Sequence, residues 1–414
     1  MKIQTLKGFR DFLPKEARKR QYVINTLKKV FESYGFEPLE TPALEYEEIL
    51  LGKYGEEGDK LMYRFEDQGK RKVALRYDQT VPLARVVAQY GPPAGGLPIP
   101  FKRYQIQPVW RAENTQKGRF REFLQCDADV VGTKSVLSDA EVIAVAAKSL
   151  EKLGFSAKGR PASGWKILIN DRSIFENMPI GAIRAVDKLK KIGREKVLEE
   201  MVQKGISAEQ ATSILNSLEE AKPTENLQKI FRQLEQLGIR NFSFSPALAR
   251  GLDYYTGMIF EIEIEGYSAG SVCGGGRYDN LIGLFVGKQI PAVGFAFGFD
   301  RLMEAMEELG LFPDDLATTK VLVTIFSPEL KEKSIKISSY LRENNINTEL
   351  YLDESNPLDK QLKYADQKGI PYAIIIGPDE AKNNTVTLKN LKTGDQKTVD
   401  QKELAGLIAI EKHS

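Results

Sequence analysis

The chain has 414 residues, which is too long for one typical hydrophobic core, so two or three domains are expected. Its hydrophobic fraction of 42% and charged fraction of 28% are those of an ordinary globular protein, and a net charge of +2 confines any nucleic-acid site to a local patch. No apolar run approaches the ~18 residues of a membrane span. The N-terminus, MKIQTLKGFRDFLP, also lacks the apolar core of an export signal, so no membrane association is expected.

The counts of cysteine and histidine limit the chemistry that is open to the chain. The only cysteines, Cys126 and Cys273, form no CxxC pattern, which fits a cytoplasmic protein in a reducing compartment. The only histidine, His413, lies beside the C-terminus. This excludes a Ser-His-Asp triad, a histidine general base within the fold and a histidine-rich zinc site. Any chemistry must therefore depend on carboxylates, arginines, hydroxyl groups, backbone groups or a metal held by oxygen.

In chain order, the first predicted element is a helix that begins after Pro14, a residue suited to the first helical turn. Apolar residues then recur at helical spacing as far as Gly35, which ends the helix. An extended segment (FEPLETPALE), a short strand (KVALRY) and a helix that begins near Thr80 follow. Beyond a loop rich in glycine and proline, residues 101–131 are predicted to form a long hairpin.

The middle of the chain is different in character. Residues 171–240 show helical periodicity with few strand-like runs, and they include a basic stretch at residues 184–196. Strand character returns with MIFEIEIEG, a glycine cluster and AVGFAFGF, which leads into a helix. After a linker, residues 320–414 alternate strands and helices, which indicates a small α/β domain with mixed strands. Its first strand is not followed by GxGxxG, so no dinucleotide site is predicted there.

The hairpin carries the most informative pattern, because the side chains of a strand point alternately to two faces. One face is polar except for one aromatic ring, and its residues are Arg119, Arg121, Phe123, Gln125, Asp127 and Asp129. The other face is mostly apolar and suits a core. Arg111 and Glu113, on the preceding strand, are expected to share the polar face.

Two interpretations of this polar face are open from the pattern alone. The simpler one is a solvated sheet face with paired cross-strand charges. The other is the floor of a ligand site, because arginine binds phosphate in bidentate geometry, phenylalanine stacks on a flat base, and carboxylates receive an ammonium group. Periodicity does not decide between them.

Five segments, in order between residues 7 and 301, resemble the motifs of one enzyme family. KGFRDFLP with the following helix and FEPLETP resembles motif 1 of class II aminoacyl-tRNA synthetases, QPVWRAENTQKGRFREFLQCDAD resembles motif 2, and AVGFAFGFDRL resembles motif 3. ARGLDYYTG and CGGGRYDNL are similar to two stretches peculiar to histidyl-tRNA synthetases. The C-terminal α/β segment is similar to the anticodon-binding domain of these enzymes, so the resemblance covers nearly the whole chain.

The resemblance implies a fold, an activity and partners. The fold is an α+β catalytic domain with an antiparallel sheet of the class II type in residues 1–170 and 241–318, a helical insertion domain in residues 171–240, and an anticodon-binding α/β domain in residues 320–414. The activity is ligation of L-histidine to histidine tRNA through a histidyl-adenylate, with ATP and its Mg²⁺ as substrate and no dedicated protein metal site. Motif 1 implies a homodimer.

The resemblance also assigns site residues, position by position. The implied catalytic residues, Arg111 and Arg250, would hold the α-phosphate of ATP. The residues implied to bind ATP are Arg111, Glu113, Arg121, Phe123 and Arg301. The residues implied to bind histidine are Asp78, Gln79, Thr80, Arg111, Gln125, Asp129, Arg250, Tyr254 and Tyr255. Within that set, Asp78 and Thr80 would bind the α-amino group with the help of Gln125, and Asp129 with Tyr255 would contact the imidazole.

Simpler structural roles are also open for several of these positions. Arg301 would lie in the first turn of a helix, where the macrodipole disfavours a cation; a bound polyphosphate would explain this, or Asp300 would neutralise it. Residues at the start of a helix, such as Asp78, often cap it. Residues 274–276, all glycine, suit an ordinary turn as well as close approach to a ligand. The basic stretch at 184–196 suits the acceptor arm of tRNA or a solvated helix face.

One alternative function belongs to a different class. The regulatory subunit of ATP phosphoribosyltransferase resembles the synthetase catalytic domain and binds histidine without charging tRNA. It generally lacks the anticodon-binding domain, and its ATP-binding arginines are lost. Because this chain has residues 320–414 and keeps Arg111, Glu113, Arg121 and Arg301, the enzyme is the favoured hypothesis.

Overall fold

The computed structural model describes residues 2–92, 95–115, 118–156, 164–250 and 254–410. Its contacts divide the chain into two compact units. The first comprises Met1–Leu13 and Arg20–Phe312, and the second comprises Pro14–Lys19 and Pro313–Ser414.

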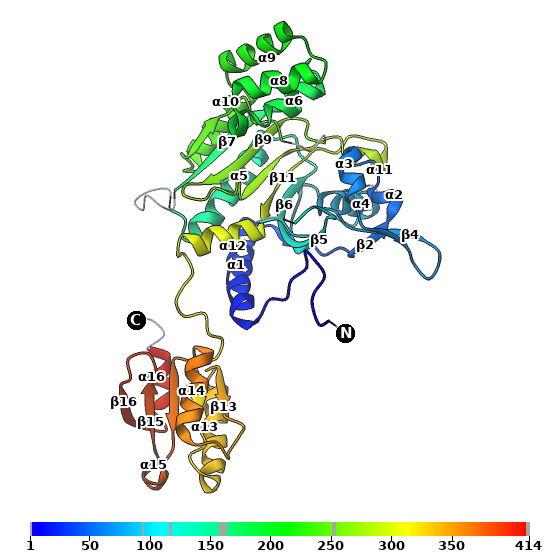
Figure 1. Ribbon diagram of the computed structural model, residues 1–414. Coiled ribbons are helices and arrows are strands. Elements are labelled where there is room, and N and C mark those ends of the chain that lie inside the picture. Colours follow the sequence, from blue (N-terminus) through cyan, green and yellow to red (C-terminus); the bar gives the residue numbers. More distant parts are fainter. Residues whose placement is uncertain (1, 93–94, 116–117, 157–163, 251–253, 411–414) are drawn as a thin grey trace. The chain divides into compact units, whose positions relative to one another are not determined.

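The first unit is built on an eight-stranded sheet with the order β1-β5-β6-β11-β10-β9-β7-β8 (Figure 1). Its strands are β1 (Glu37–Pro38), β5 (Phe101–Trp110), β6 (Glu122–Val131), β7 (Trp165–Asp171), β8 (Phe242–Phe244), β9 (Met258–Ile264), β10 (Cys273–Arg277) and β11 (Ala292–Gly298). Neighbours are antiparallel except at the two edges, where β1 is parallel to β5 and β8 is parallel to β7. The predicted antiparallel sheet is confirmed.

The predicted hairpin is formed by β5 and β6, which are ten residues long each. Both strands stop short of the connecting loop, which contains Arg111, Glu113, Arg119 and Arg121. The prediction that these four residues lie on the strands is therefore wrong. Within β6 the alternation is confirmed, because its even-numbered residues from Cys126 to Val130 point into the core.

One face of the large sheet packs against helices and forms the main core. These helices are α1 (Pro14–Ser33), α5 (Val136–Lys152), α10 (Glu225–Gln236) and α12 (Phe299–Glu308). The first begins at a proline, as predicted. The Ser135 side chain caps α5 by accepting a hydrogen bond from the backbone N–H of Leu137.

A smaller layer partly covers the other face of the sheet. It contains the three-stranded antiparallel sheet β2-β4-β3, made of β2 (Leu44–Tyr46), β3 (Arg64–Glu66) and β4 (Lys72–Leu75). Its helices are α2 (Glu47–Leu50), α3 (Gly55–Lys60), α4 (Thr80–Tyr90) and α11 (Gly283–Val286). Helix α4 begins at Thr80, as predicted, and buries Leu83 and Val87 in a second core with Phe101.

Residues 171–240 contribute to two different cores. The 3₁₀ helix η1 (Arg172–Phe175) and helices α6 (Ile180–Val186), α7 (Leu189–Ile192), α8 (Arg194–Gln203) and α9 (Ala208–Glu220) build a third core that also contains Leu248 and Ile259. In contrast, α10 packs its Leu227, Ile230 and Leu234 into the main core.

Three cations of the basic stretch have carboxylate partners in the first unit. Lys188 pairs with Glu200 at 2.7 Å and Arg194 with Glu219 at 2.5 Å. Lys190 pairs with Glu263. These contacts favour the interpretation of a solvated, ion-paired helix face for the three residues.

The second unit is a mixed five-stranded sheet with the order β13-β12-β14-β15-β16. The strands β12 (Val321–Val323), β13 (Thr348–Leu350) and β14 (Tyr372–Ile375) are parallel, and β15 (Thr385–Asn390) and β16 (Gln396–Asp400) continue the sheet antiparallel. The helical elements are η2 (Pro328–Leu330), α13 (Lys331–Glu343), α14 (Leu358–Lys368), α15 (Pro378–Asn383) and α16 (Leu404–Ile410). The predicted α/β domain with mixed strands is confirmed. In the described part of the chain, no helix is long and apolar enough to cross a membrane.

Candidate active site

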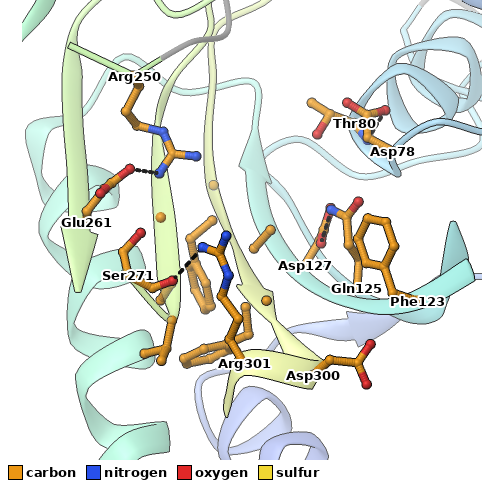
Figure 2. A pocket seen from close by; sticks show the side chains of 18 of the residues that line it. Asp78, Thr80, Phe123, Gln125, Asp127, Arg250, Glu261, Ser271, Asp300 and Arg301 are labelled. Atoms are coloured by element: carbon orange, nitrogen blue, oxygen red, sulfur yellow. Dashed lines mark hydrogen bonds and ion pairs between the residues drawn. The ribbon is translucent and has the colours of Figure 1, made fainter. Parts of the chain in front are cut away.

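A pocket of about 470 Å³ lies in the first unit, over the open face of β6, β10 and β11. Figure 2 shows Arg250 and Arg301 on one side of it, and Asp78, Gln125 and Asp127 on the other. The assigned residues that line it are Asp78, Thr80, Arg111, Glu113, Phe123, Gln125, Asp129, Arg250, Tyr254, Tyr255 and Arg301. The solvated-face interpretation of the hairpin is therefore wrong for β6, whose polar face forms one wall of a pocket.

One carboxylate oxygen of Asp78 is hydrogen-bonded within the protein, and the other is available to the pocket. Its Oδ1 accepts hydrogen bonds from the Tyr54 hydroxyl at 2.9 Å and from the backbone N–H groups of Thr80 and Val81 at 3.1 Å each. Its Oδ2 is buried and has no hydrogen-bond partner among the described residues. Burial raises the pKa of this carboxyl group. Asp78 thus stabilises the first turn of α4 and still offers one oxygen to a ligand ammonium group.

Two assigned residues do not line the pocket and support its walls instead. The Nε2 of Gln79 donates to the backbone oxygens of Gln107 at 2.8 Å and of Gln125 at 3.3 Å, which ties the segment before α4 to β5 and β6. The Nε of Arg121 donates to the backbone oxygen of Glu113 at 3.1 Å. Both side chains are therefore placed to position neighbouring pocket residues.

Arg111 and Arg301 reach the pocket with no carboxylate partner among the described residues. The Nε of Arg111 donates to the backbone oxygen of Tyr77 at 3.1 Å, and its guanidinium lies 5.1 Å from the ring centre of Phe123. Arg301 Nη1 donates to the backbone oxygen of Ser271 at 3.1 Å. Both positive charges are available to an anion.

Asp300 does not neutralise Arg301, so that alternative is wrong. Its two carboxylate oxygens pair instead with Arg10 at 2.9 Å and Arg20 at 3.0 Å. A cation in the first turn of a helix is unfavourable unless an anion is nearby. Arg301 therefore carries a positive charge in the first turn of α12 that Asp300 does not neutralise.

Arg250 lies across the floor of the pocket. It has a left-handed backbone (φ +50°), and its guanidinium pairs with Glu261 at 3.2 Å. A Cβ atom on Gly274 would lie 1.5 Å from Arg250 Nη1, and one on Gly276 would lie 2.8 Å from the ring of Tyr255. These glycines belong to the central strand β10, so their interpretation as a turn is wrong. They are needed because side chains from other segments cross directly over this strand.

Replacement of Gly274 by alanine is expected to displace the Arg250 guanidinium and to lower the rate of the adenylate formation that the resemblance implies by about 10²-fold, since misplacement by 1 Å near reacting atoms has effects of that size. The rate is measured by ATP–pyrophosphate exchange. The matched control is Gly181→Ala, where the added methyl group would be 3.6 Å from its nearest neighbour, Lys204. Equal rates for the two variants would contradict this role of Gly274.

Asp129, assigned to the imidazole, is already paired within the protein. Its Oδ2 lies 2.8 Å from Arg103 Nη2, and its Oδ1 accepts a hydrogen bond from the Tyr278 hydroxyl. It lies opposite Gly294, where a Cβ atom would be 1.9 Å from its Oδ1. Burial raises its pKa in spite of the neighbouring Arg103.

The assignment missed several residues of the site, of which Asp127 and Tyr278 line the pocket and Arg103 supports it. Asp127 is on the polar face that alternation predicted, but the resemblance attached no role to it. Arg103 lies opposite Asp129 in the β5–β6 register, a pairing that follows once the lengths of the strands are known. Tyr278 comes directly after the glycine-rich strand, and the sequence alone carries no signal for its contact with Asp129.

The pocket is lined both by buried carboxylates and by arginines that have no carboxylate partner among the described residues. Asp78, Asp127 and Asp129 are all nearly inaccessible to solvent. Arg111 and Arg301 provide positive charge without a carboxylate partner among the described residues. This arrangement suits a ligand that combines an ammonium group with negatively charged groups. No cluster of three or more metal-ligating side chains occurs among the described residues.

Comparisons with known proteins show which families the chain resembles. The family model described as histidyl-tRNA synthetase matches residues 8–159 and 174–302, and that described as anticodon binding domain matches residues 320–410. A histidine–tRNA ligase of Cytophaga hutchinsonii is 42% identical over 94% of this chain and 96% of its own length. One of Gloeobacter violaceus is also 42% identical, over 98% of each chain.

Solved structures give the same result. The crystal structure of histidyl-tRNA synthetase from Nostoc sp. PCC 7120 matches with a TM-score of 0.85 and 32% identity, over 99% of this chain and 100% of that chain. A Bacillus halodurans structure titled as an ATP phosphoribosyltransferase regulatory subunit/histidyl-tRNA synthetase has a TM-score of 0.69 and 23% identity over 88% of this chain and 97% of its own, and shares only the fold. The matches over both units show that this chain belongs to the histidyl-tRNA synthetase family.

Proposed function

We propose that the chain ligates L-histidine to histidine tRNA by way of a histidyl-adenylate formed from ATP. The observation that carries this proposal is the pocket itself. Its buried carboxylates suit the ammonium group of an amino acid, and Arg111 and Arg301, which have no carboxylate partner among the described residues, suit the phosphates of ATP. Membership of the histidyl-tRNA synthetase family supports histidine as the amino acid.

In the first step, a carboxylate oxygen of histidine attacks the α-phosphorus of ATP. The new bond joins this oxygen to phosphorus, the bond to the β-phosphate oxygen breaks, and pyrophosphate leaves. The nucleophile is already ionised, so no protein base is required. Arg111 and Arg250 are proposed to orient the two groups and to stabilise the charge that develops at phosphorus.

In the second step, a hydroxyl group of the terminal ribose of the tRNA attacks the carbonyl carbon of the adenylate. An ester bond forms, AMP leaves, and the proton of the hydroxyl group is released. This requires no further protein nucleophile, which agrees with a chain whose only histidine is His413.

The remaining pocket residues are proposed to divide between the two small substrates. Phe123 and Glu113 bind the adenine, and Arg301 binds the outer phosphates, with Mg²⁺ entering as part of the ATP substrate. Arg121 is proposed to bind the outer phosphates together with Arg301, while its Nε holds the backbone oxygen of Glu113. Asp78, Thr80 and Gln125 bind the α-amino group of histidine, and Gln79 fixes the segment that carries Asp78. Tyr254 and Tyr255 enclose the ring beside Asp129.

The domain roles are proposed in the same way. Residues 1–170 and 241–318 form the catalytic domain and residues 171–240 a helical insertion, although α10 of that insertion packs in the catalytic core. Residues 320–414 form the anticodon-binding domain, which the family match supports. A cytoplasmic location is proposed together with this reaction.

A homodimer is proposed from the resemblance to motif 1, and several exposed apolar side chains near it support this proposal. They are Ile3, Leu6, Leu13, Leu44, Tyr46 and Phe65. Sedimentation analysis of the purified chain tests it. A monomer at micromolar concentration would contradict it.

ATP–pyrophosphate exchange with each of the twenty amino acids, followed by charging of histidine tRNA, tests the activity. Exchange that depends on histidine alone, together with charging, is the expected result. Binding of histidine without exchange would overturn the proposal and support a histidine-binding regulatory protein instead.

A further inference from the structure

We propose that Asp127 is a specificity residue of the histidine site and that its carboxyl group shares a single proton with a ring nitrogen of bound histidine. This inference rests on the proposed function and adds a residue to it. It follows from which carboxylates of the pocket are already engaged by the protein.

Asp129 is held by the protein at both oxygens, although its Oδ2 accepts no hydrogen bond among the described residues. One of its oxygens pairs with Arg103, whose side chain is fully buried, and the other accepts the hydrogen bond from Tyr278. Asp78 similarly uses one oxygen for Tyr54 and the first turn of α4, and its remaining oxygen suits the α-amino group. Asp127, a further buried carboxyl group of the pocket, is engaged differently.

Asp127 has only weak contacts within the described residues. Its two oxygens accept from Gln125 Nε2 at 3.2 and 3.5 Å, and it forms no ion pair with the residues that the structure describes. Asp127 is 2% exposed and lines the pocket. Figure 2 shows it beside Gln125. A buried carboxyl group with so few partners is costly unless it is protonated or a ligand supplies the missing hydrogen bond.

Its place along β6 matches the dimensions of histidine. Gln125, Asp127 and Asp129 follow one another on the same face, about 7 Å apart at each step of two residues. When Asp78 and Gln125 hold the α-amino group, the next group along the wall is Asp127. The ring nitrogens of histidine are only a few bonds from its α-nitrogen, so Asp127, the first carboxyl group beyond Gln125 on this face, lies within their reach.

The proton requirement follows from the neighbouring charges. Burial is the largest influence and raises the pKa of Asp127 to about 8; Arg103 lowers it, and Asp129 and Asp78 raise it. Below about pH 8, Asp127 of the protein without substrate is protonated and can donate this proton to the neutral imidazole ring of histidine. Above that pH, Asp127 is ionised, so one proton must be taken up from water when histidine binds. The titratable groups that interact with it are Arg76, Asp78, Arg103, Cys126, Asp129, Tyr255 and Cys273.

The test compares kcat/KM for histidine in ATP–pyrophosphate exchange between the unchanged protein and Asp127→Asn, from about pH 6.5 to about pH 9.5. Asparagine keeps the size of the side chain and its acceptance from Gln125, but does not titrate. Ionisation of the substrates changes kcat/KM of both proteins equally, so it cancels when kcat/KM of the unchanged protein is divided by that of the variant. We expect the ratio of unchanged protein to variant to be constant up to about pH 8 and then to fall about tenfold per pH unit.

A second variant, Asp127→Ala, is expected to lower kcat/KM for histidine by about 10- to 100-fold at neutral pH, the effect of losing a charge-assisted hydrogen bond, with an unchanged KM for ATP. The control is Cys126→Ala, on the same strand but facing the core, which should leave the pH profile unchanged. A ratio that does not vary with pH, while the unchanged protein exchanges normally, would overturn the inference alone. Absence of exchange in the unchanged protein would overturn the proposed function as well.

Discussion

Replacement of Arg250 by alanine is expected to lower kcat for ATP–pyrophosphate exchange by about 10³-fold, because one charged donor to the reacting phosphate is lost in a site shielded from water. The structure supports so large an effect. Arg250 is held by Glu261 at 3.2 Å and by the backbone oxygen of Phe260 at 3.4 Å, so it is positioned before any substrate binds. Its Nε is buried without a partner among the described residues. KM for histidine should change much less than kcat.

The matched control is Arg240→Ala, which removes an exposed arginine that does not line the pocket. This variant should retain the activity of the unchanged protein. A loss of less than about tenfold on replacing Arg250 would be too small for a transition-state contact and would contradict the proposed catalytic role.

Local pattern was sufficient to predict much of the first unit. Alternation along β6 placed Phe123, Gln125, Asp127 and Asp129 on one face, and all four line the pocket. The prediction for β6 succeeded because a shift of register by one residue would move the apolar side chains of a strand away from the core. The pattern failed at the ends of β5 and β6, since the loop that carries Arg111 follows no fixed period.

Contacts between segments that are distant in the sequence could not be predicted from local periodicity. The glycines of β10 look like a turn when read locally, and only the side chain of Arg250 lying over the strand explains Gly274. Likewise, Asp300 pairs with Arg10 and Arg20, which are almost 300 positions away, and not with the adjacent Arg301. Helix α10 joins the main core because its apolar face meets α5, which no periodicity within residues 171–240 reveals.

Replacement of Arg277 by methionine is expected to destabilise the first unit by about 3–5 kcal/mol, because one partner of a buried ion pair is removed and the other is left without compensation. Two nitrogens of Arg277 donate to both oxygens of Asp139, at 2.9 and 2.6 Å, and its other hydrogen bonds join β10 to the segment before α5 and to Asp279. The Asp139 side chain is only 1% exposed. Equilibrium unfolding in urea, followed by tryptophan fluorescence, measures the loss. Trp110 and Trp165 are the only tryptophans of the chain, and both belong to the first unit.

Two further variants separate the buried ion pair from a general effect of replacing arginine. Arg194→Met breaks an exposed pair with Glu219 and should change stability by less than about 1 kcal/mol. Adding Asp139→Leu to Arg277→Met removes the uncompensated charge and should restore a large part of the lost stability, since apolar groups of similar volume replace buried ion pairs well. If the double variant is no more stable than Arg277→Met, the loss arises from the contacts of Arg277 with Thr133 and Ser138 and not from the isolated carboxylate.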